Sequence, residues 1–165
     1  MNLNCRSIVH FTSLCVPFLE LSKNGNKSVV ILTMDSGEKP NHGEMLFSTS
    51  KAMTNMFIEC MALELAYSKI RVNGVSAGTA NTMFRIKRDV GITEYESKIY
   101  LENVTENKPL KVAEHKEKLP SPDNIADVIL WLASNESSYI TGEIIKVDDG
   151  MSLTSGYPKP KSQIK

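Results

Sequence analysis

The hydrophobic and polar positions of the chain alternate between long helical stripes and short continuous apolar runs. The longest helical pattern covers residues 44–67, a stretch that contains neither proline nor glycine. Its apolar residues recur every three or four positions, which predicts a helix with a wide apolar face. These residues are Ala52, Met53, Met56, Phe57, Cys60, Met61 and Leu63. A face of this width predicts a helix covered on more than one side, with Asn55, Glu59 and Glu64 at its rim or in solvent.

Two further helices are predicted by their patterns. Residues 2–21 form a helical pattern that Pro17 is expected to bend, because proline removes a backbone hydrogen bond. Its predicted apolar stripe consists of Ile8, Phe11, Thr12, Cys15, Phe18 and Leu19. A third helix is predicted to begin at Ser121, since a serine cap is followed there by Pro122 and the acidic Asp123.

Short apolar runs between these helices predict strands. Residues 29–32 and 70–75 are rich in β-branched residues, and 143–147 forms a third such run. Continuous apolar runs are typical of strands buried on both faces, as in parallel sheets. The order of strands and helices therefore predicts an α/β fold. The loops at 33–37 and 76–78 follow the first two strands, and open α/β sheets bind their ligands at such carboxyl ends.

The region 83–120 is charged and lacks clear periodicity, so that short helices and a mobile lid both remain open. We expect one domain over residues 1–155, followed by a flexible tail at 156–165 that contains proline, glycine and several lysines.

Composition excludes several classes of partner. Lys plus Arg and Asp plus Glu both number 19, so the net charge of zero favours neither nucleic acid nor an anionic membrane. No apolar run approaches the roughly 18–20 residues that span a bilayer, and the start of the chain does not match a signal peptide. Three cysteines without CxxC spacing and three histidines without metal-ligand spacing predict no disulfide framework and no metal site. A cytoplasmic protein is therefore expected.

Several segments occur together in an order that indicates a family. They are the segment around Asn4, residues 28–37, Phe47-Ser48-Thr49-Ser50-Lys51, residues 70–78 with Thr82, and residues 139–150. With these, the chain resembles the C-terminal two-thirds of a classical short-chain dehydrogenase/reductase over about residues 2–155. The resemblance implies a partial Rossmann-like, doubly wound parallel sheet that lacks its N-terminal strands. It also implies an oxidoreductase that uses NAD or NADP to interconvert carbonyls and alcohols.

The family's catalytic set of Asn, Ser, Tyr and Lys transfers to this chain only in part. Asn4 and Lys51 match the family Asn and Lys, whereas Met34 stands at the Ser position and Phe47 at the Tyr position. Phenylalanine lacks the titratable hydroxyl, and loss of one positioned acid or base costs roughly 10²–10⁴ in rate. Thr33 and Ser36 remain as alternative hydroxyls for the serine, although the register favours Met34.

The resemblance also assigns cofactor positions, namely Lys51 at the ribose and Thr82 at the nicotinamide, with Gly78 in the same segment. Asp149 stands where the family has a second glycine. No glycine-rich phosphate turn is found in the sequence, so we expect cofactor binding to be impaired.

Three interpretations remain open. The first is a truncated short-chain oxidoreductase that is weak or inactive, a pseudoenzyme. The second is a non-catalytic partner that forms homo- or hetero-oligomers through the helices at 2–21 and 44–67. The third is a fragment that does not fold stably. The substrate and the choice between NAD and NADP are not encoded in these residues.

Overall fold

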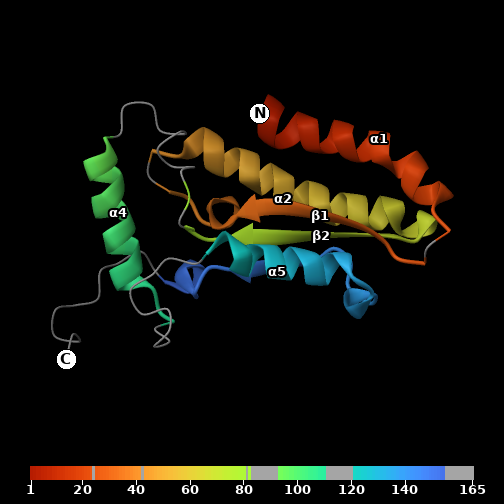
Figure 1. The fold of residues 1–165 in the computed structure, drawn as a ribbon. Coiled ribbons are helices and arrows are strands. Elements are labelled where there is room, and N and C mark those ends of the chain that lie inside the picture. Colours follow the sequence, from red (N-terminus) through yellow and green to blue (C-terminus); the bar gives the residue numbers. More distant parts are fainter. Residues whose placement is uncertain (24, 42, 81, 83–92, 111–120, 155–165) are drawn as a thin grey trace.

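The centre of the fold is a three-stranded parallel sheet (Figure 1). The structure is a computed structural model, which describes residues 1–154 except 24, 42, 81, 83–92 and 111–120. Strands β1 (Lys27–Met34), β2 (Ile70–Ala77) and β3 (Ile144–Val147) lie in the order β1-β2-β3. The observed α/β architecture confirms the predicted partial Rossmann-like sheet.

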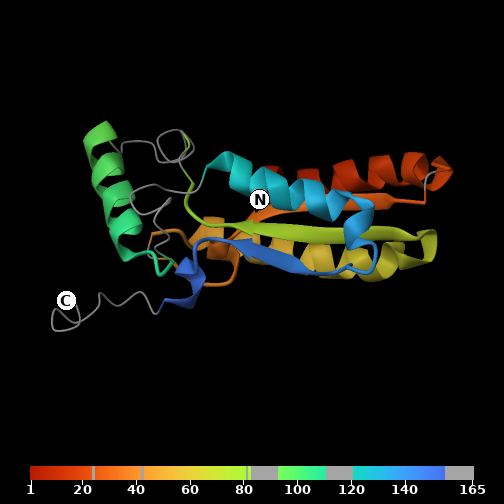
Figure 2. The same cartoon turned by 60° about the horizontal axis from the view of Figure 1, so that its bottom comes forward.

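Helices cover both faces of this sheet (Figures 1 and 2). A π-helical turn, η1 (Asn2–Arg6), leads into α1 (Ser7–Leu21), and α1 lies with α2 (Met45–Leu65) on one face. Helix α5 (Pro122–Ala133) covers the other face, and α4 (Glu94–Asn107) stands beyond the carboxyl ends of the strands. Short 3₁₀ turns complete the described chain: η2 (Asp35–Gly37), η3 (Ala66–Ser68), η5 (Asn135–Ser137) and η6 (Met151–Leu153).

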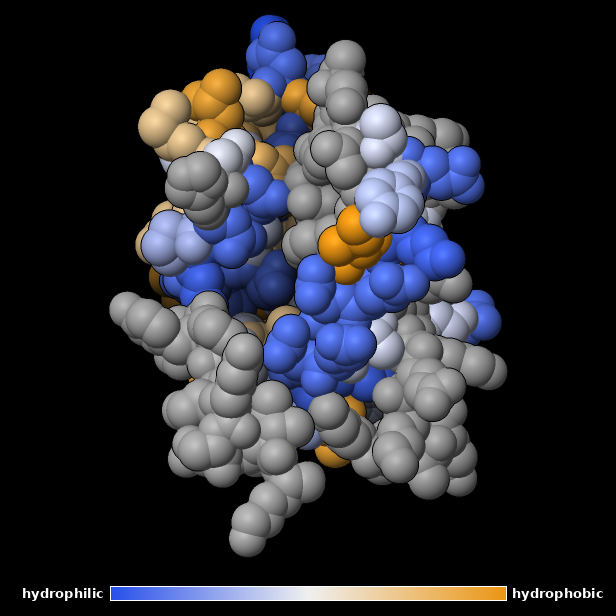
Figure 3. Space-filling model, turned by 90° about the vertical axis from the view of Figure 1, so that its left-hand side faces the viewer, coloured by the Kyte–Doolittle hydropathy of each residue, from blue (hydrophilic) through white to orange (hydrophobic). Residues whose placement is uncertain are grey.

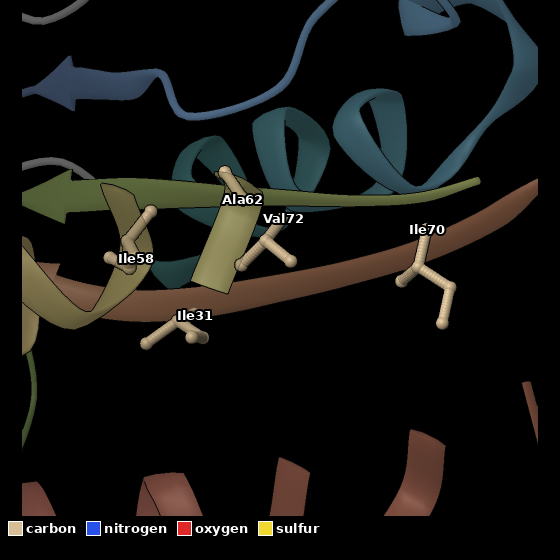
Figure 4. Close-up of a cluster of buried hydrophobic side chains, with 5 residues drawn as sticks. All are labelled: Ile31, Ile58, Ala62, Ile70 and Val72. Carbon is tan, nitrogen blue, oxygen red and sulfur yellow. The ribbon is translucent and has the colours of Figure 1, made fainter. Parts of the chain in front are cut away.

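Apolar residues of the strands pack on both faces, as the continuous runs predicted. On one face lies the cluster drawn in Figure 4, formed by Ile31, Ile58, Ala62, Ile70 and Val72. On the other face, Val75 and Ala77 pack with Ile125 and Leu132 of α5. The sheet is thus a central layer between two apolar layers, and its polar loops remain at the strand ends.

The predicted apolar stripe of α2 is largely wrong, although Met61 packs against the core as predicted. The residues that α2 buries are Ser50, Thr54, Ile58 and Ala62, whereas Met56 and Leu63 are exposed. The buried face is built from small side chains because η1 lies against it: Thr54 Oγ1 is 2.9 Å from the carbonyl oxygens of both Asn4 and Ser50. Large side chains would hold the two elements apart.

The predicted stripe of α1 is right only in part. Thr12 is buried, and Ile8 and Leu19 pack against the core. Phe11 and Phe18, however, are 70% and 76% exposed. Pro17 lies inside the observed helix.

Helix α5 begins as predicted. Ser121 is its N-cap, its hydroxyl accepts a hydrogen bond from the backbone N–H of Asp123, and its own N–H donates to Asn124 Oδ1. In the charged region, helix α4 over Glu94–Asn107 supports the alternative of short helices. The rest of that region, residues 83–92 and 111–120, and the tail at 156–165 lie outside the described residues.

One guanidinium group joins the amino end of β2 to the carboxyl end of α5. Arg71 Nη1 and Nη2 donate to backbone carbonyls and to Asn26 Oδ1 at 2.9–3.4 Å. The carbonyls belong to Leu132, Ser134, Ser137 and Ile140. Helix C-termini leave such carbonyls without intrahelical partners, so Arg71 caps α5.

Candidate active site

A cavity of about 1120 Å³ lies where β1 and β2 end. Five of the residues singled out in the sequence line it, namely Met34, Phe47, Lys51, Gly78 and Thr82. Hydrophilic side chains predominate on this end of the molecule, and hydrophobic ones gather toward its upper edge (Figure 3). The carboxyl ends of parallel strands therefore hold the site, as open α/β sheets generally do.

Lys51 and Phe47 lie one turn apart on α2. Lys51 Nζ is 5.7 Å from the centroid of the Phe47 ring, within the range of a cation–π contact. Burial lowers the pKa of Lys51, because a desolvated ammonium is disfavoured, and the negative charge of a Cys5 thiolate would oppose this shift. The ring thus occupies the place beside the lysine where a tyrosine would present its hydroxyl.

Met34 ends β1 in an extended conformation and faces the cavity without a hydrogen-bond donor. The two alternative hydroxyls also line the cavity, but both are engaged. Thr33 Oγ1 donates to Asn55 Oδ1 at 2.6 Å, and Ser36 Oγ donates to Glu44 Oε2 at 3.3 Å. Neither hydroxyl is held ready to orient a substrate oxygen.

Asn4 does not line the cavity. Its side chain donates from Nδ2 to Ser50 Oγ at 3.0 Å, on the residue next to Lys51, and its carbonyl oxygen faces Thr54 Oγ1. The structure therefore places Asn4 beside the helix that carries Lys51.

Gly78 and Thr82 follow β2. A Cβ atom at Gly78 would lie 2.7 Å from Asp148 Cβ, so only glycine permits this close approach of the two strand ends. The Gly78 N–H donates to Val147 O at 2.9 Å. Thr82 is exposed at the rim of the cavity.

Sequence reasoning missed a polar cluster on the same wall. Asn41 Nδ2 donates both to Ser36 Oγ at 3.2 Å and to Glu44 Oε2 at 3.1 Å. Burial raises the pKa of Asp35, a hydrogen bond from the Ser36 backbone acts against it, and the carboxylates of Asp148, Glu44 and Glu38 raise it further. The polar run after β1 was the only signal for this cluster.

Gly37 was also missed. A Cβ there would lie 2.8 Å from the carbonyl carbon of Lys51 and 3.0 Å from the backbone nitrogen of Ala52. The turn η2 therefore lies against the backbone of α2 at Lys51.

The sheet, the site at its carboxyl ends and the lysine on the following helix define a Rossmann-like α/β protein of the dehydrogenase class. The protein family described as enoyl-(acyl carrier protein) reductase matches residues 1–152. This chain belongs to the short-chain dehydrogenase/reductase family.

Curated relatives agree with this assignment. The chain is 32% identical over 151 residues to the 3-oxoacyl-[acyl-carrier-protein] reductase FabG of Thermotoga maritima, covering 92% of this chain and 55% of that protein. It is 31% identical over 159 residues to a chloroplastic tropinone reductase homolog of Arabidopsis thaliana, covering 96% and 45%. With the 7alpha-hydroxysteroid dehydrogenase of Escherichia coli K12 it shares 29% over 148 residues, covering 90% and 52%. The chain spans about half the length of these relatives.

The described residues also bear on membrane-spanning helices and metal sites. No helix in that part of the chain has the length and apolarity needed to cross a membrane. Within the same residues, no group of three or more His, Cys, Asp or Glu side chains is placed to hold a metal ion.

Proposed function

We propose that this chain is a short-chain dehydrogenase/reductase-type oxidoreductase whose carbonyl–alcohol redox activity is weak or absent. The observation that carries the proposal is the Phe47 ring beside Lys51, with no hydroxyl to donate or accept the reacting proton. Tyr67, Tyr95 and Tyr139 are all strongly exposed and do not line the cavity, so none of these three replaces the missing tyrosine. Asn4, Met34, Phe47 and Lys51 are the proposed catalytic positions.

Members of the family generally use NAD or NADP, whose nicotinamide supplies or accepts the hydride. The described residues fit one end of such a cofactor. Lys51 and Thr82 line the cavity where the ribose and nicotinamide would be held, and Gly78 lets the strand end pass close to Asp148. The described helices α2 and α5 have Glu44 and Ser121 as their N-caps and are not preceded by a glycine-rich turn. Neither helix therefore offers the usual binding site for the cofactor pyrophosphate. Weak cofactor binding is therefore part of the proposal.

The test restores the missing groups. Phe47→Tyr combined with Met34→Ser is expected to raise the rate of NAD(P)H oxidation with a panel of ketones by roughly 10²–10⁴ over the parent protein. Adding Lys51→Ala should remove that gain. Cofactor binding is measured in parallel by NAD(P)H fluorescence, so that catalysis is compared at equal occupancy. Turnover in the parent protein as fast as in the restored variant, and abolished by Lys51→Ala, would refute the proposal.

A second candidate function is supported by the exposed faces of α1 and α2. Members of the family commonly form oligomers, and both helices present apolar side chains to solvent. On α2 and the following turn η3 these are Met45, Met53, Met56, Leu63 and Tyr67; on η1 and α1 they are Leu3, Phe11, Leu14, Phe18 and Leu21. In each set the spacing of three, four, seven or eight residues puts them on one stripe. Such stripes fit a non-catalytic partner that pairs with an intact relative.

Co-expression tests the second candidate. A tagged copy of this chain is expected to co-purify with an intact short-chain dehydrogenase/reductase from the same cell, and Met56→Glu with Leu63→Glu should abolish the association. Recovery of the unmodified chain as a monomer, with no relative bound, would count against it.

A further inference from the structure

Lys51 differs from the other described lysines around the carboxyl end of the sheet. Lys39 Nζ donates to Thr154 O at 2.7 Å, and Lys108 Nζ lies 3.2 Å from Asp149 Oδ2. Lys146 pairs with Glu38. Among the described residues, Lys51 Nζ has no hydrogen bond and no ion pair, and it lies 5.7 Å from the centroid of the Phe47 ring. Its amine is therefore free to meet a ligand in the cavity.

Apolar side chains form part of the lining of the cavity that this amine also lines. Met34, Phe47, Val104 and Ile125 line the same cavity of about 1120 Å³, a size at which small ligands are commonly enclosed. Burial also lowers the pKa of Lys51, so more of its amine is neutral than in a solvated lysine. Lysines activated in this way, by desolvation in an apolar pocket, are nucleophiles toward carbonyl groups.

We propose that Lys51 captures aldehydes or ketones covalently in this cavity, as a Schiff base on its ε-amino group. This goes beyond the proposed redox function, because it needs no nicotinamide and no tyrosine. Phe47 favours it in two ways. The ring provides no acidic hydroxyl to hold the lysine as an ammonium, and its face can stabilise the cationic product.

The step balances without an oxidant or a reductant. The neutral Nζ attacks the carbonyl carbon, an N–C bond forms, and the carbonyl oxygen takes up a proton to give a carbinolamine. The C–O bond then breaks, water leaves, and the nitrogen retains one proton as an iminium ion. The ammonium form of Lys51 gives up one proton before the attack, and the departing hydroxyl takes up one proton to leave as water. The positive charge beside Phe47 is therefore the same before and after the step, and water is the only co-product.

The experiment traps the adduct. The full chain is incubated with benzaldehyde or with cyclohexanone, reduced with sodium cyanoborohydride, and analysed by intact mass and peptide mapping. We expect a single adduct on Lys51 that forms at least tenfold faster than labelling of any other lysine. Lys51→Arg keeps the cation and removes the nucleophile, so it should lose the fast adduct while keeping the circular dichroism spectrum of the parent.

Lys39→Met is the matched control, because it removes the other lysine whose side chain lines the cavity. It should leave the fast adduct in place. The proposal is overturned if labelling spreads over many lysines with Lys51 no faster than the rest, or if Lys51→Arg is labelled as fast as the parent. Because no nicotinamide is present, either result leaves the redox proposal untouched.

Discussion

At the scale of single residues, Asp35 is the side chain whose charge the site disfavours. Burial raises the pKa of its carboxyl above 3.8, and nearby carboxylates add to the effect, although the Ser36 backbone N–H opposes it. The folded protein therefore binds this proton more tightly than the unfolded chain does. Well below pH 3.8 the carboxyl is protonated in both states and does not change the free energy of unfolding. As the pH rises from 3.8 through the higher pKa of the folded state, the free energy of unfolding falls.

Asp35→Asn should therefore be more stable than the parent at neutral pH. The gain should disappear as the pH is lowered below about 3.8, where the parent carboxyl is protonated in both states. Urea unfolding at a series of pH values measures the effect. Asp127→Asn removes one negative charge from an exposed position of α5 and is the matched control. Equal stability of Asp35→Asn and the parent at neutral pH would contradict this account.

Among the residues that the structure describes, two with side chains have left-handed backbones, Lys69 at φ 56° and Asp149 at φ 54°. Glycine would relieve about 1–2 kcal/mol at such a position, less its own entropic cost of roughly 0.5–1 kcal/mol. Lys69 is exposed, so Lys69→Gly should stabilise the fold by up to about 1 kcal/mol.

Asp149→Gly should act in the opposite direction. The Asp149 carboxylate lies 3.2 Å from Lys108 Nζ, and the Lys108 side chain is only 2% exposed. Loss of a partner from a buried pair costs about 3–5 kcal/mol when nothing else compensates, so a net destabilisation of about 1–3 kcal/mol is expected. Equilibrium unfolding of both glycine variants, side by side, decides whether the ion pair outweighs the backbone strain. An increase in stability for Asp149→Gly would show that the backbone strain at Asp149 outweighs the ion pair with Lys108.

At the scale of elements, η2 makes a close backbone contact with α2 that the sequence did not reveal. Gly37→Ala should destabilise the fold by about 1–3 kcal/mol, because its Cβ would meet backbone atoms of Lys51 and Ala52 at 2.8 and 3.0 Å. Gly25→Ala is the matched control, since nothing lies within 4 Å of its Cβ and the same residue change there should be close to neutral. Thermal unfolding measures both, and equal melting temperatures would argue against the close contact.

The elements themselves were predictable, and the faces that they bury were not. The absence of proline and glycine marks the extent of α2, and the Ser121 cap marks the start of α5. The hydrophobic pattern predicted that α2 buries Met56 and Leu63. The helix instead buries Ser50 and Thr54, because η1 approaches closely there. Small side chains carry little hydrophobic signal, and only the tertiary packing shows that their size is what matters. For the same reason, the cavity was expected at the strand ends, while Gly37 and the polar cluster of Ser36, Asn41 and Glu44 were not.

At the scale of the whole molecule, the apolar stripes of α1 and α2 lie on one face. Within the described residues, no strand pairs with the edge of β1 away from β2. Exposed apolar stripes and open strand edges both favour association. We therefore expect the isolated chain to associate with itself.

Met56→Glu combined with Leu63→Glu should shift the protein toward monomer in light scattering at micromolar concentration, because two charges would be buried in the contact. Leu130→Glu is the control: it puts the same charge on an exposed leucine of α5, on the opposite side of the sheet. A monomer before any substitution, or an equal effect of Leu130→Glu, would contradict the assignment of the contact to α2.

The cap that Arg71 forms on α5 also has a kinetic consequence. The guanidinium joins Asn26, β2 and the carbonyls that follow α5, segments separated by up to 69 positions in the sequence. Contacts of such long range close large loops, which is slow in folding. Helix α5 has its own N-terminal cap and should gain transient structure early, but its last turn cannot be held until β2 has paired. In a hydrogen-exchange experiment, the amides at the end of α5 should become protected together with those of β2, later than the amides in the middle of their own helix.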